Sequence, residues 1–279
     1  MTEREGVRIG MVNFINTAAL YEVWKETVHN PAWQVVEAAP AELNHMLARG
    51  ELDLGIVSSH EYADHPGLYQ ILPGLSISST GAVGSVFLFS RFAPEELDGK
   101  RVCLSSQSKT SNGLIKIIFE DFYDVRPVYC LAGDGAETSD CQAVLAIGDQ
   151  ALRMKGEAGF PYVLDLGDVW QRRTTLPFVF AVWAVSERFV ARRSACLREI
   201  HRQLVRCAQE GRDRLPEISS RVAPRIPMAP QDCRRYLQGI EFDLGPDKLR
   251  GLEAFYQYLI RRGEAMPQAL PVKICTTVA

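Results

Sequence analysis

The stretch SVFLFSR, residues 85–91, is an apolar run with a polar residue at each end, and it is typical of a buried strand. A second run of this kind, PFVFAVWAVS, lies at residues 177–186, just before a long C-terminal helical region. If both runs cross between lobes, residues 92–176 form an inserted lobe, and residues 1–91 plus 177–279 form the other. The two runs therefore predict a two-lobed molecule with a hinged cleft between the lobes.

Strand-like and helix-like segments alternate outward from these runs, as in α/β units with a largely parallel sheet. We expect strands, among others, at residues 8–14, 34–37, 54–57, 101–104 and 143–147. We expect helices, among others, at residues 18–26, 40–49, 112–121, 149–155 and, as one long region, 186–215. The fold class is therefore α/β.

Composition excludes several classes of protein. The chain has 279 residues, 47% of them hydrophobic and 23% charged, with a net charge of -3. No basic stripe indicates nucleic-acid binding, and no apolar stretch approaches the ~20 residues of a membrane span. The apolar run after the charged N-terminus is a short strand and not the core of a signal peptide. The seven cysteines contain no C-x-x-C pair, so we expect buried core thiols, no metal, and a reduced cytoplasmic protein.

Polar residues stand at four strand-to-helix junctions, where ligands collect in α/β folds. They are Asn16-Thr17, Ser58-Ser59, the stretch 105–113 with Ser108, Thr110 and Ser111, and Gly148-Asp149. Any single one of these is more typical of a helix N-cap, which stabilises a helix by about 1 kcal/mol, than of a ligand site. Four of them converging on one cleft favour a small anion, since helix N-termini offer unpaired N–H groups. The sequence therefore predicts an anion-binding cleft.

The chain lacks the common catalytic motifs. No P-loop, no G-x-G-x-x-G, no G-x-S-x-G and no H-E-x-x-H is present, which disfavours nucleotide-dependent enzymes, serine hydrolases and zinc proteases. His60 is the only histidine near a junction and is a candidate base, although an exposed helix-start position is the alternative. Glu61 fits either a site residue or a carboxylate that matches the helix dipole.

Several segments together resemble the chorismate dehydratase family of the futalosine route to menaquinone. They are NFINTAAL (13–20), PAELNHMLARGELDLGIVSSHEYA (40–63), ILPGLSISSTGAVGSVFLFSR (71–91), SKTSNGL (108–114), AIGDQAL (146–152) and LGDVWQRRTTLPFVFAVWA (166–184). The similarity runs from about residue 7 into the C-terminal helices. It implies a hinged, type II periplasmic-binding-protein-like fold and the conversion of chorismate to 3-enolpyruvylbenzoate and water.

The resemblance also implies roles for particular residues. Asn16 and Ser85 match the residues expected beside the reacting ring. Positions expected to hold the substrate carboxylates are matched by Ser58, Ser59, Thr110 and Ser111, with Ser108 and Lys109 adjacent. Thr17, Gly148 and Asp149 are added as substrate-binding candidates from their place at the junctions. One departure from the family is Thr175, which stands where glycine is expected.

Two rival functions stay open at this point. A sister enzyme, dihydroxynaphthoate synthase, is expected to carry a His-Glu pair where this chain has Gly148-Asp149, so the substitution favours the dehydratase. A non-catalytic anion-binding protein of the same fold is the other rival. The partner we expect is a dianionic small molecule, chorismate, with no nucleic acid and no membrane. We expect no cofactor, and a homodimer is compatible with the sequence.

Overall fold

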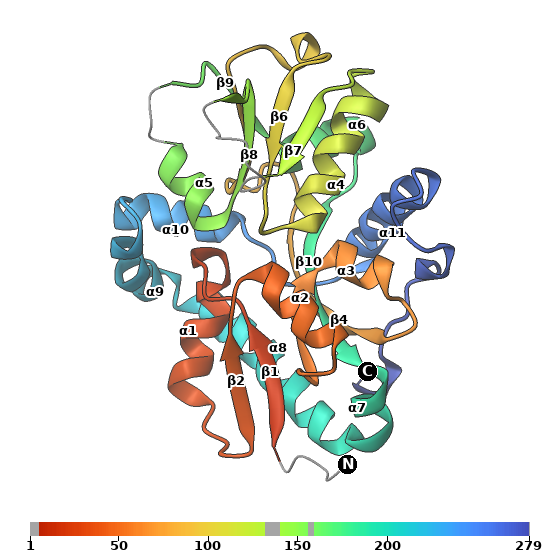
Figure 1. Cartoon of the computed structure of the whole chain (residues 1–279). Helices are drawn as coiled ribbons and strands as arrows, with labels where there is room; N and C mark the ends of the chain where they lie inside the picture. The colour runs from red at the N-terminus through yellow and green to blue at the C-terminus, as the bar shows by residue number, and fades with distance from the viewer. Residues whose placement is uncertain (1–5, 132–139, 156–158, 279) are drawn as a thin grey trace.

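The computed structural model describes residues 6–131, 140–155 and 159–278, and within them two five-stranded sheets. The first sheet has the order β2-β1-β3-β10-β4 and the second the order β7-β6-β8-β5-β9. The first contains β1 (Val7–Met11), β2 (Trp33–Glu37), β3 (Leu54–Ser58), β4 (Tyr69–Ser79) and β10 (Phe178–Ser186). The second contains β5 (Val86–Ser90), β6 (Arg101–Leu104), β7 (Val128–Leu131), β8 (Ala143–Ile147) and β9 (Tyr162–Asp165). Figure 1 shows the two sheets in separate lobes, with the second sheet above the first.

Both apolar runs are strands, and each is the antiparallel strand of the sheet that it enters. β5 pairs antiparallel with β8 and β9, and β10 pairs antiparallel with β3 and β4. The lobe boundary expected after Arg91 assigns β5 to the first lobe, and this assignment is wrong because β5 is a strand of the second sheet. All five residues of β5 are buried within the second sheet, so the chain changes sheets before Val86.

Helices cover both sheets, which explains why strands such as β3, β5 and β8 are apolar along their whole length. The helices that follow strands of the two sheets are α1 (Ala18–Thr27), α2 (Pro40–Ala48), α3 (Ser59–Asp64), α4 (Lys109–Ile117), α5 (Gly148–Met154) and α6 (Leu166–Thr174). The C-terminal helices are α7 (Glu187–Arg192), α8 (Ser194–Asp213), α9 (Leu215–Val222), α10 (Pro230–Gly239) and α11 (Pro246–Arg261). In Figure 1, α9 and α10 lie at one side of the junction between the sheets and α11 at the other.

The single helical region expected over residues 186–215 is wrong in one respect, because the structure divides it into two helices, α7 and α8, and a third helix, α9, begins at its last residue. Arg193, with φ -130° and ψ 37°, separates α7 from α8. Pro216 lies in the first turn of α9, where a missing N–H costs no helical hydrogen bond but prevents α8 from continuing.

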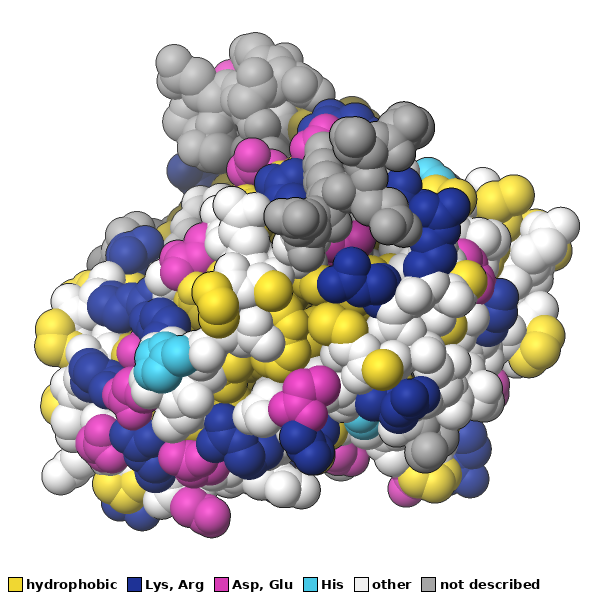
Figure 2. Space-filling model, turned by 90° about the horizontal axis from the view of Figure 1, so that it is seen from below, with side chains coloured by type: hydrophobic (Ala, Val, Ile, Leu, Met, Phe, Trp, Pro, Cys, Tyr) yellow, Lys and Arg dark blue, Asp and Glu magenta, His cyan; other side chains and the backbone are white. Residues whose placement is uncertain are grey.

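The charge distribution agrees with the balanced composition. Figure 2 shows positive and negative side chains interspersed over one face, around a strip of hydrophobic side chains. Among the described residues, no helix combines the length and the hydrophobicity that crossing a membrane requires.

Candidate functional site

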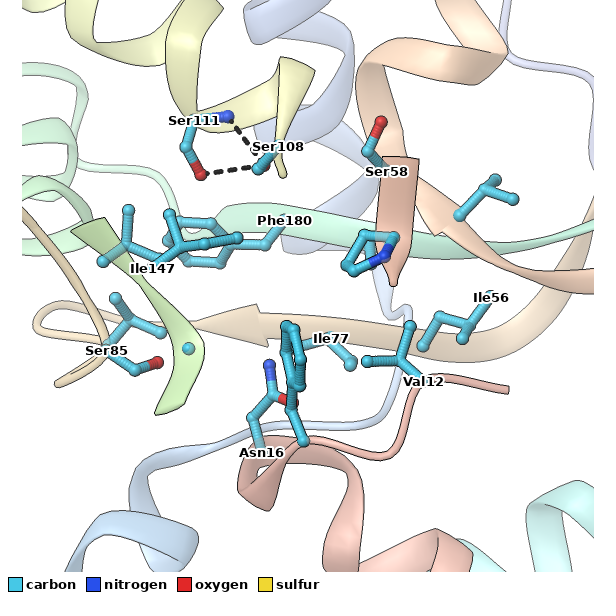
Figure 3. A pocket seen from close by; sticks show the side chains of 17 residues that line it. Val12, Asn16, Ile56, Ser58, Ile77, Ser85, Ser108, Ser111, Ile147 and Phe180 are labelled. Atoms are coloured by element: carbon cyan, nitrogen blue, oxygen red, sulfur yellow. Dashed lines mark hydrogen bonds between the residues drawn. The ribbon is translucent and has the colours of Figure 1, made fainter. Parts of the chain in front are cut away.

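A cleft lies between the two sheets and takes up about 610 Å³, including the part that is open to solvent. Its polar lining residues are Asn16, Ser58, Ser85, Ser108 and Ser111. Its other lining residues are Val12, Phe14, Pro40, Ile56, Val57, Ile77, Val83, Val86, Ile147, Gly148, Phe180 and Ala181. Figure 3 shows Asn16 and Ser85 on one side of the cleft and Ser58, Ser108 and Ser111 on the other. Six of the ten residues proposed from the sequence therefore line one space: Asn16, Ser58, Ser85, Ser108, Ser111 and Gly148.

Asn16 brings an unsatisfied acceptor to this cleft. Among the described residues, its Oδ1 is the one buried side-chain nitrogen or oxygen atom without a hydrogen-bond partner. An unpaired buried polar atom costs about 1–3 kcal/mol. A ligand that donates a hydrogen bond to Asn16 Oδ1 removes that cost, so the atom marks a place for a hydroxyl group.

Two predicted residues do not line the cleft but hold Asn16 in place. Asn16 belongs to a short 3-10 helix, η1 (Ile15–Thr17), at the end of the loop after β1. The Thr17 hydroxyl donates to the carbonyls of Val12 (2.7 Å) and Phe14 (2.8 Å). The Asp149 carboxylate, at the start of α5, accepts the Ile15 N–H at 3.0 Å. Thr17 and Asp149 therefore fix the turn that presents Asn16, and no ligand contact is assigned to them.

The cleft serines are oriented by buried donors behind them. The Asn44 side-chain amide donates to Ser58 Oγ at 2.9 Å and accepts the Ser58 N–H at 3.1 Å. After β6 of the second sheet, Ser108 Oγ donates to Ser111 Oγ at 3.0 Å and accepts the Ser111 N–H at 3.2 Å as the N-cap of α4. Ser58 Oγ and Ser111 Oγ each accept one of these hydrogen bonds. Their own hydroxyl hydrogens are therefore free to be donated to a ligand group in the cleft.

Ser85 follows the same pattern. It is 1% exposed, and the Tyr236 hydroxyl donates to its Oγ at 2.8 Å. Three hydroxyls, those of Ser58, Ser85 and Ser111, are thus set as donors toward the cleft, which is the polarity that carboxylate oxygens require.

Sequence reasoning missed Asn44 and Tyr236. The one signal that points to Asn44, which is 6% exposed, is a polar residue among the apolar residues Leu43, Met46 and Leu47 on the buried face of α2. No local signal identifies Tyr236, because its partner lies 151 residues earlier in the chain.

Ser59 and Thr110 are buried outside the cleft, contrary to the expectation that they hold carboxylates. Ser59 Oγ donates to the Val179 carbonyl at 2.8 Å and lies 3.2 Å from Thr110 Oγ1. Thr110 Oγ1 also accepts the His60 N–H at 3.0 Å. These bonds join the starts of α3 and α4, so both hydroxyls link the two sheets at one edge of the cleft and do not face it.

His60 and Glu61 are also absent from the cleft lining. The His60 ring is buried, with Nε2 2.8 Å from the Glu264 carbonyl, and burial lowers its pKa below the ordinary value. Glu61 pairs with His65 at 2.9 Å and accepts the Tyr69 hydroxyl at 3.2 Å, while burial raises its pKa. Both side chains have structural partners outside the cleft. The exposed position expected as the alternative for His60 is wrong, because its side chain is buried at the start of α3.

Gly148 and Thr175 have unusual backbone conformations for physical reasons. Gly148 has φ +56°, and a Cβ there would lie 2.9 Å from the Phe14 ring. Thr175 has φ +63° as the C-cap of α6, a left-handed conformation that favours glycine. The departure from the family at Thr175 therefore falls at a position where glycine is preferred.

Lys109, the residue after Ser108 in the sequence, forms an ion pair with Asp64.

Two groups of potential metal ligands occur among the described residues, and neither contributes to the cleft lining. Glu61, Asp64 and His65 form one group beside α3. Cys103, Cys130 and Cys141 form the other, in the second sheet, with their sulfur atoms within 4.8 Å of one another.

Comparisons with known proteins agree with this geometry. The model of a family described as menaquinone biosynthesis matches residues 7–261. Chorismate dehydratase from Thermus thermophilus is 32% identical over 268 residues, covering 90% of this chain and 94% of the relative.

Two solved structures show the same fold at low sequence identity. The alkanesulfonate-binding protein of Xanthomonas axonopodis superposes with a TM-score of 0.67 at 16% identity, covering 99% of each chain. The periplasmic aliphatic sulphonate binding protein of Escherichia coli gives 0.64 at 14% identity, covering 98% of this chain and 90% of that one. The fold is thus periplasmic-binding-protein-like. The family match over residues 7–261, together with the 32% identity to chorismate dehydratase, shows that the chain belongs to the menaquinone biosynthesis family.

Proposed function

We propose that this protein is a chorismate dehydratase, a carbon–oxygen lyase that converts chorismate to 3-enolpyruvylbenzoate and water in the cytoplasm. The observation that carries the proposal is the polarity of the cleft. Three oriented serine hydroxyls and one unpaired acceptor, Asn16 Oδ1, surround an apolar space. This arrangement suits a ligand with two carboxylates, a carbon ring and a hydroxyl group, and chorismate has all of these.

The walls of the cleft support binding of the carbon ring. Phe14, Ile77, Ile147 and Phe180 are among the side chains that enclose the space, and Figure 3 shows the latter three across it. Burial of apolar surface is favourable by about 25 cal/mol per Å², so these side chains contribute to the affinity for the carbon ring.

The carboxylates are held by neutral donors in this proposal. Ser58 and Ser111 face the cleft from the two different sheets, and the first turn of α4 adds the positive end of a helix dipole. Hydrogen bonds to a charged group contribute about 1.5–3 kcal/mol each, whereas the dipole adds only about 0.3–1 kcal/mol. The serine hydroxyls therefore supply most of the selectivity for a dianion. Because they come from both sheets, the dianion also draws the two sheets together.

The base in this proposal is the substrate itself. Among the described residues that line the cleft there is no Asp, Glu, His, Lys, Arg, Cys or Tyr, so no lining side chain can accept the ring proton. The enolpyruvyl carboxylate of chorismate takes the proton from the ether-bearing ring carbon. The hydroxyl leaves from the next carbon, and the proton and hydroxide together make one water. The ring becomes aromatic, which drives the elimination, so the protein mainly has to position the groups.

Asn16 and Ser85 act on the departing hydroxyl. The Ser85 hydroxyl donates to its oxygen, on which negative charge develops as the carbon–oxygen bond breaks. Asn16 Oδ1 accepts the hydrogen of the same hydroxyl, which satisfies the atom that lacks a partner in the protein. Both contacts orient the leaving group relative to the ring proton.

Purified protein incubated with chorismate, without added metal or cofactor, tests the proposal. We expect 3-enolpyruvylbenzoate to appear in liquid chromatography in proportion to enzyme and time. Binding of chorismate without conversion would instead support the non-catalytic anion-binding rival. The absence of both binding and conversion would mean that the substrate is a different anion.

A further inference from the structure

Tyr236 contacts the site from a distant part of the sequence. It lies on α10, and its hydroxyl donates to Ser85 Oγ at 2.8 Å. Its ring packs against Gly84, since a Cβ on Gly84 would lie 3.2 Å from Tyr236 Cδ2. The aromatic ring and the hydroxyl of one side chain therefore both support the short segment that carries Ser85.

The backbone around Ser85 is fixed without Tyr236. The Asp165 carboxylate accepts the N–H groups of Val83 at 3.0 Å and Gly84 at 2.7 Å. The Ser85 carbonyl accepts the Gly148 N–H at 2.8 Å. The Tyr236 hydroxyl adds a preferred direction for the Ser85 hydroxyl hydrogen. Because Ser85 Oγ accepts the Tyr236 hydrogen, its own hydrogen has to point away from Tyr236.

We propose that Tyr236 is a positioning residue that turns the Ser85 hydroxyl toward the leaving hydroxyl of the substrate. This inference rests on the proposed dehydratase function. Burial raises the pKa of Tyr236, so the phenol stays protonated and remains a donor throughout the physiological pH range. As charge develops on the leaving oxygen, Ser85 donates more strongly and its own oxygen becomes a better acceptor for Tyr236. No proton leaves Tyr236.

The variant Tyr236→Phe keeps the ring against Gly84 and removes only the donor. We expect kcat to fall roughly ten-fold, as for loss of one neutral hydrogen bond, with the chorismate Kd and the melting temperature nearly unchanged. In a Ser85→Ala background the same substitution should have no further effect on kcat, because its target is gone. Tyr129→Phe is the matched control, since it also removes a hydroxyl hydrogen bond, to Glu120 (3.0 Å), at a residue that does not line the cleft.

Each outcome of this experiment decides the inference. Wild-type turnover is measured first, and its absence overturns both the dehydratase proposal and the role of Tyr236. Wild-type turnover with full activity in Tyr236→Phe overturns the positioning role alone. An equal loss in the wild-type and Ser85→Ala backgrounds, or a loss confined to the melting temperature, shows a purely structural role and also overturns it.

A different observation carries a second inference, in the second sheet. Cys103 on β6 and Cys130 on β7 are direct partners in the parallel register, and Cys141 lies just before β8. The Cys130 and Cys141 sulfur atoms are 3.3 Å apart, and all three sulfurs lie within 4.8 Å of one another. Cys103 and Cys141 are buried and Cys130 is partly exposed.

These separations fit a shared cation better than a disulfide. A disulfide requires sulfurs about 2.0 Å apart. A cation with metal–sulfur bonds of about 2.3 Å in tetrahedral geometry holds its sulfurs about 3.8 Å apart, which is within the observed range. We infer that Cys103, Cys130 and Cys141 form a three-thiolate site for a soft cation of the Zn²⁺ and Cd²⁺ class, with solvent as the fourth ligand.

Titration of the reduced protein with Cd²⁺ tests this second inference. We expect one ion per chain, with a sulfur-to-cadmium charge-transfer band in the ultraviolet, and loss of that band in Cys130→Ser. Cys196→Ser, a partly exposed cysteine on α8, is the matched control and should keep the band. Absence of the band in the wild type, or an undiminished band in the triple variant Cys103→Ser, Cys130→Ser, Cys141→Ser, overturns the site.

Discussion

The ring of Phe14 lies 2.9 Å from the point where a Cβ on Gly148 would stand. Phe14 follows β1 in the first sheet and Gly148 follows β8 in the second, so this contact joins the two sheets within the lining of the cleft. The left-handed φ of Gly148, +56°, adds a second reason for glycine at this position.

Gly148→Ala should therefore displace the Phe14 ring and weaken binding. We expect KM for chorismate to rise several-fold and the free energy of unfolding to fall by about 1–2 kcal/mol, the cost of a left-handed alanine. The double variant Gly148→Ala, Phe14→Leu should recover part of the loss in KM, because the smaller side chain makes room. If KM in the single variant equals that of the wild type, the contact does not shape the cleft.

Asn16→Ala should separate activity from stability. It removes the acceptor for the leaving hydroxyl, so we expect kcat to fall by about 10²–10³-fold, as when one preorganised polar group is lost from an active site. The free energy of unfolding should not fall, since Asn16 Oδ1 has no partner in the free protein. Single-turnover measurements test the expected fall in the rate of the chemical step, and urea unfolding tests the unchanged free energy of unfolding. Asn30→Ala is the control for both. Near-normal kcat in Asn16→Ala would remove it from the mechanism.

Ser58→Ala and Ser111→Ala test the binding of the carboxylates. Each removes one donor to a charged group, worth about 1.5–3 kcal/mol, so we expect Kd for chorismate to rise roughly ten- to hundred-fold. Calorimetric titration measures this directly. Ser90→Ala is the matched control, because Ser90 is a buried serine that donates to the Phe92 carbonyl and does not line the cleft. Unchanged affinity in both cleft variants would contradict the proposed polarity of the site.

His60 should matter for stability at low pH and not for turnover. Its pKa is lowered, first by burial and also by Lys109, against the opposing effects of the Glu264 carbonyl and Asp64. Above the ordinary value of 6.5 the imidazole is neutral in the folded and the unfolded chain. Below it the unfolded chain binds a proton that the folded chain excludes, so the free energy of unfolding falls as the pH falls.

The variant His60→Gln should lose this part of the pH dependence. Urea unfolding at one pH above 6.5 and one below it, for both proteins, measures the difference. We expect near-normal turnover in His60→Gln and in Glu61→Gln, because neither side chain lines the cleft. Abolished turnover in either variant while Asn16→Ala stays active would show that a protein side chain is the base.

Thr175→Gly should stabilise the protein. The φ of +63° costs a residue with a Cβ roughly 1–2 kcal/mol, which exceeds the extra chain entropy that glycine brings to the unfolded state, about 0.5–1 kcal/mol. We therefore expect a net gain of about 0.5–1 kcal/mol in urea unfolding. Thr174→Gly, one position earlier, should destabilise, because it lies in α6 and its hydroxyl donates to the Trp170 carbonyl at 2.8 Å.

Part of the site could be predicted from the sequence because its elements are local. A polar residue between a strand and the next helix lies near the edge of a sheet. This reasoning pointed to Asn16, Ser58, Ser108 and Ser111, which line the cleft. The same logic could not separate a residue facing the cleft from its neighbour. Ser59 and Thr110 differ from Ser58 and Ser111 by one position each, and one position on a helix turns a side chain by about 100°.

The sequence alone determined the α/β class, the two long apolar strands next to the connections between the sheets, and the polar character of the junctions. These follow from hydrophobic periodicity and from turn-forming residues, which act over short stretches of chain. Only the tertiary structure decided that β5 belongs to the second sheet, that Asn44 and Tyr236 orient cleft serines, and that His60 is buried away from the cleft. Each of these depends on which distant segments pack together, and such packing is set by the burial of whole faces of helices and sheets, which no local pattern specifies.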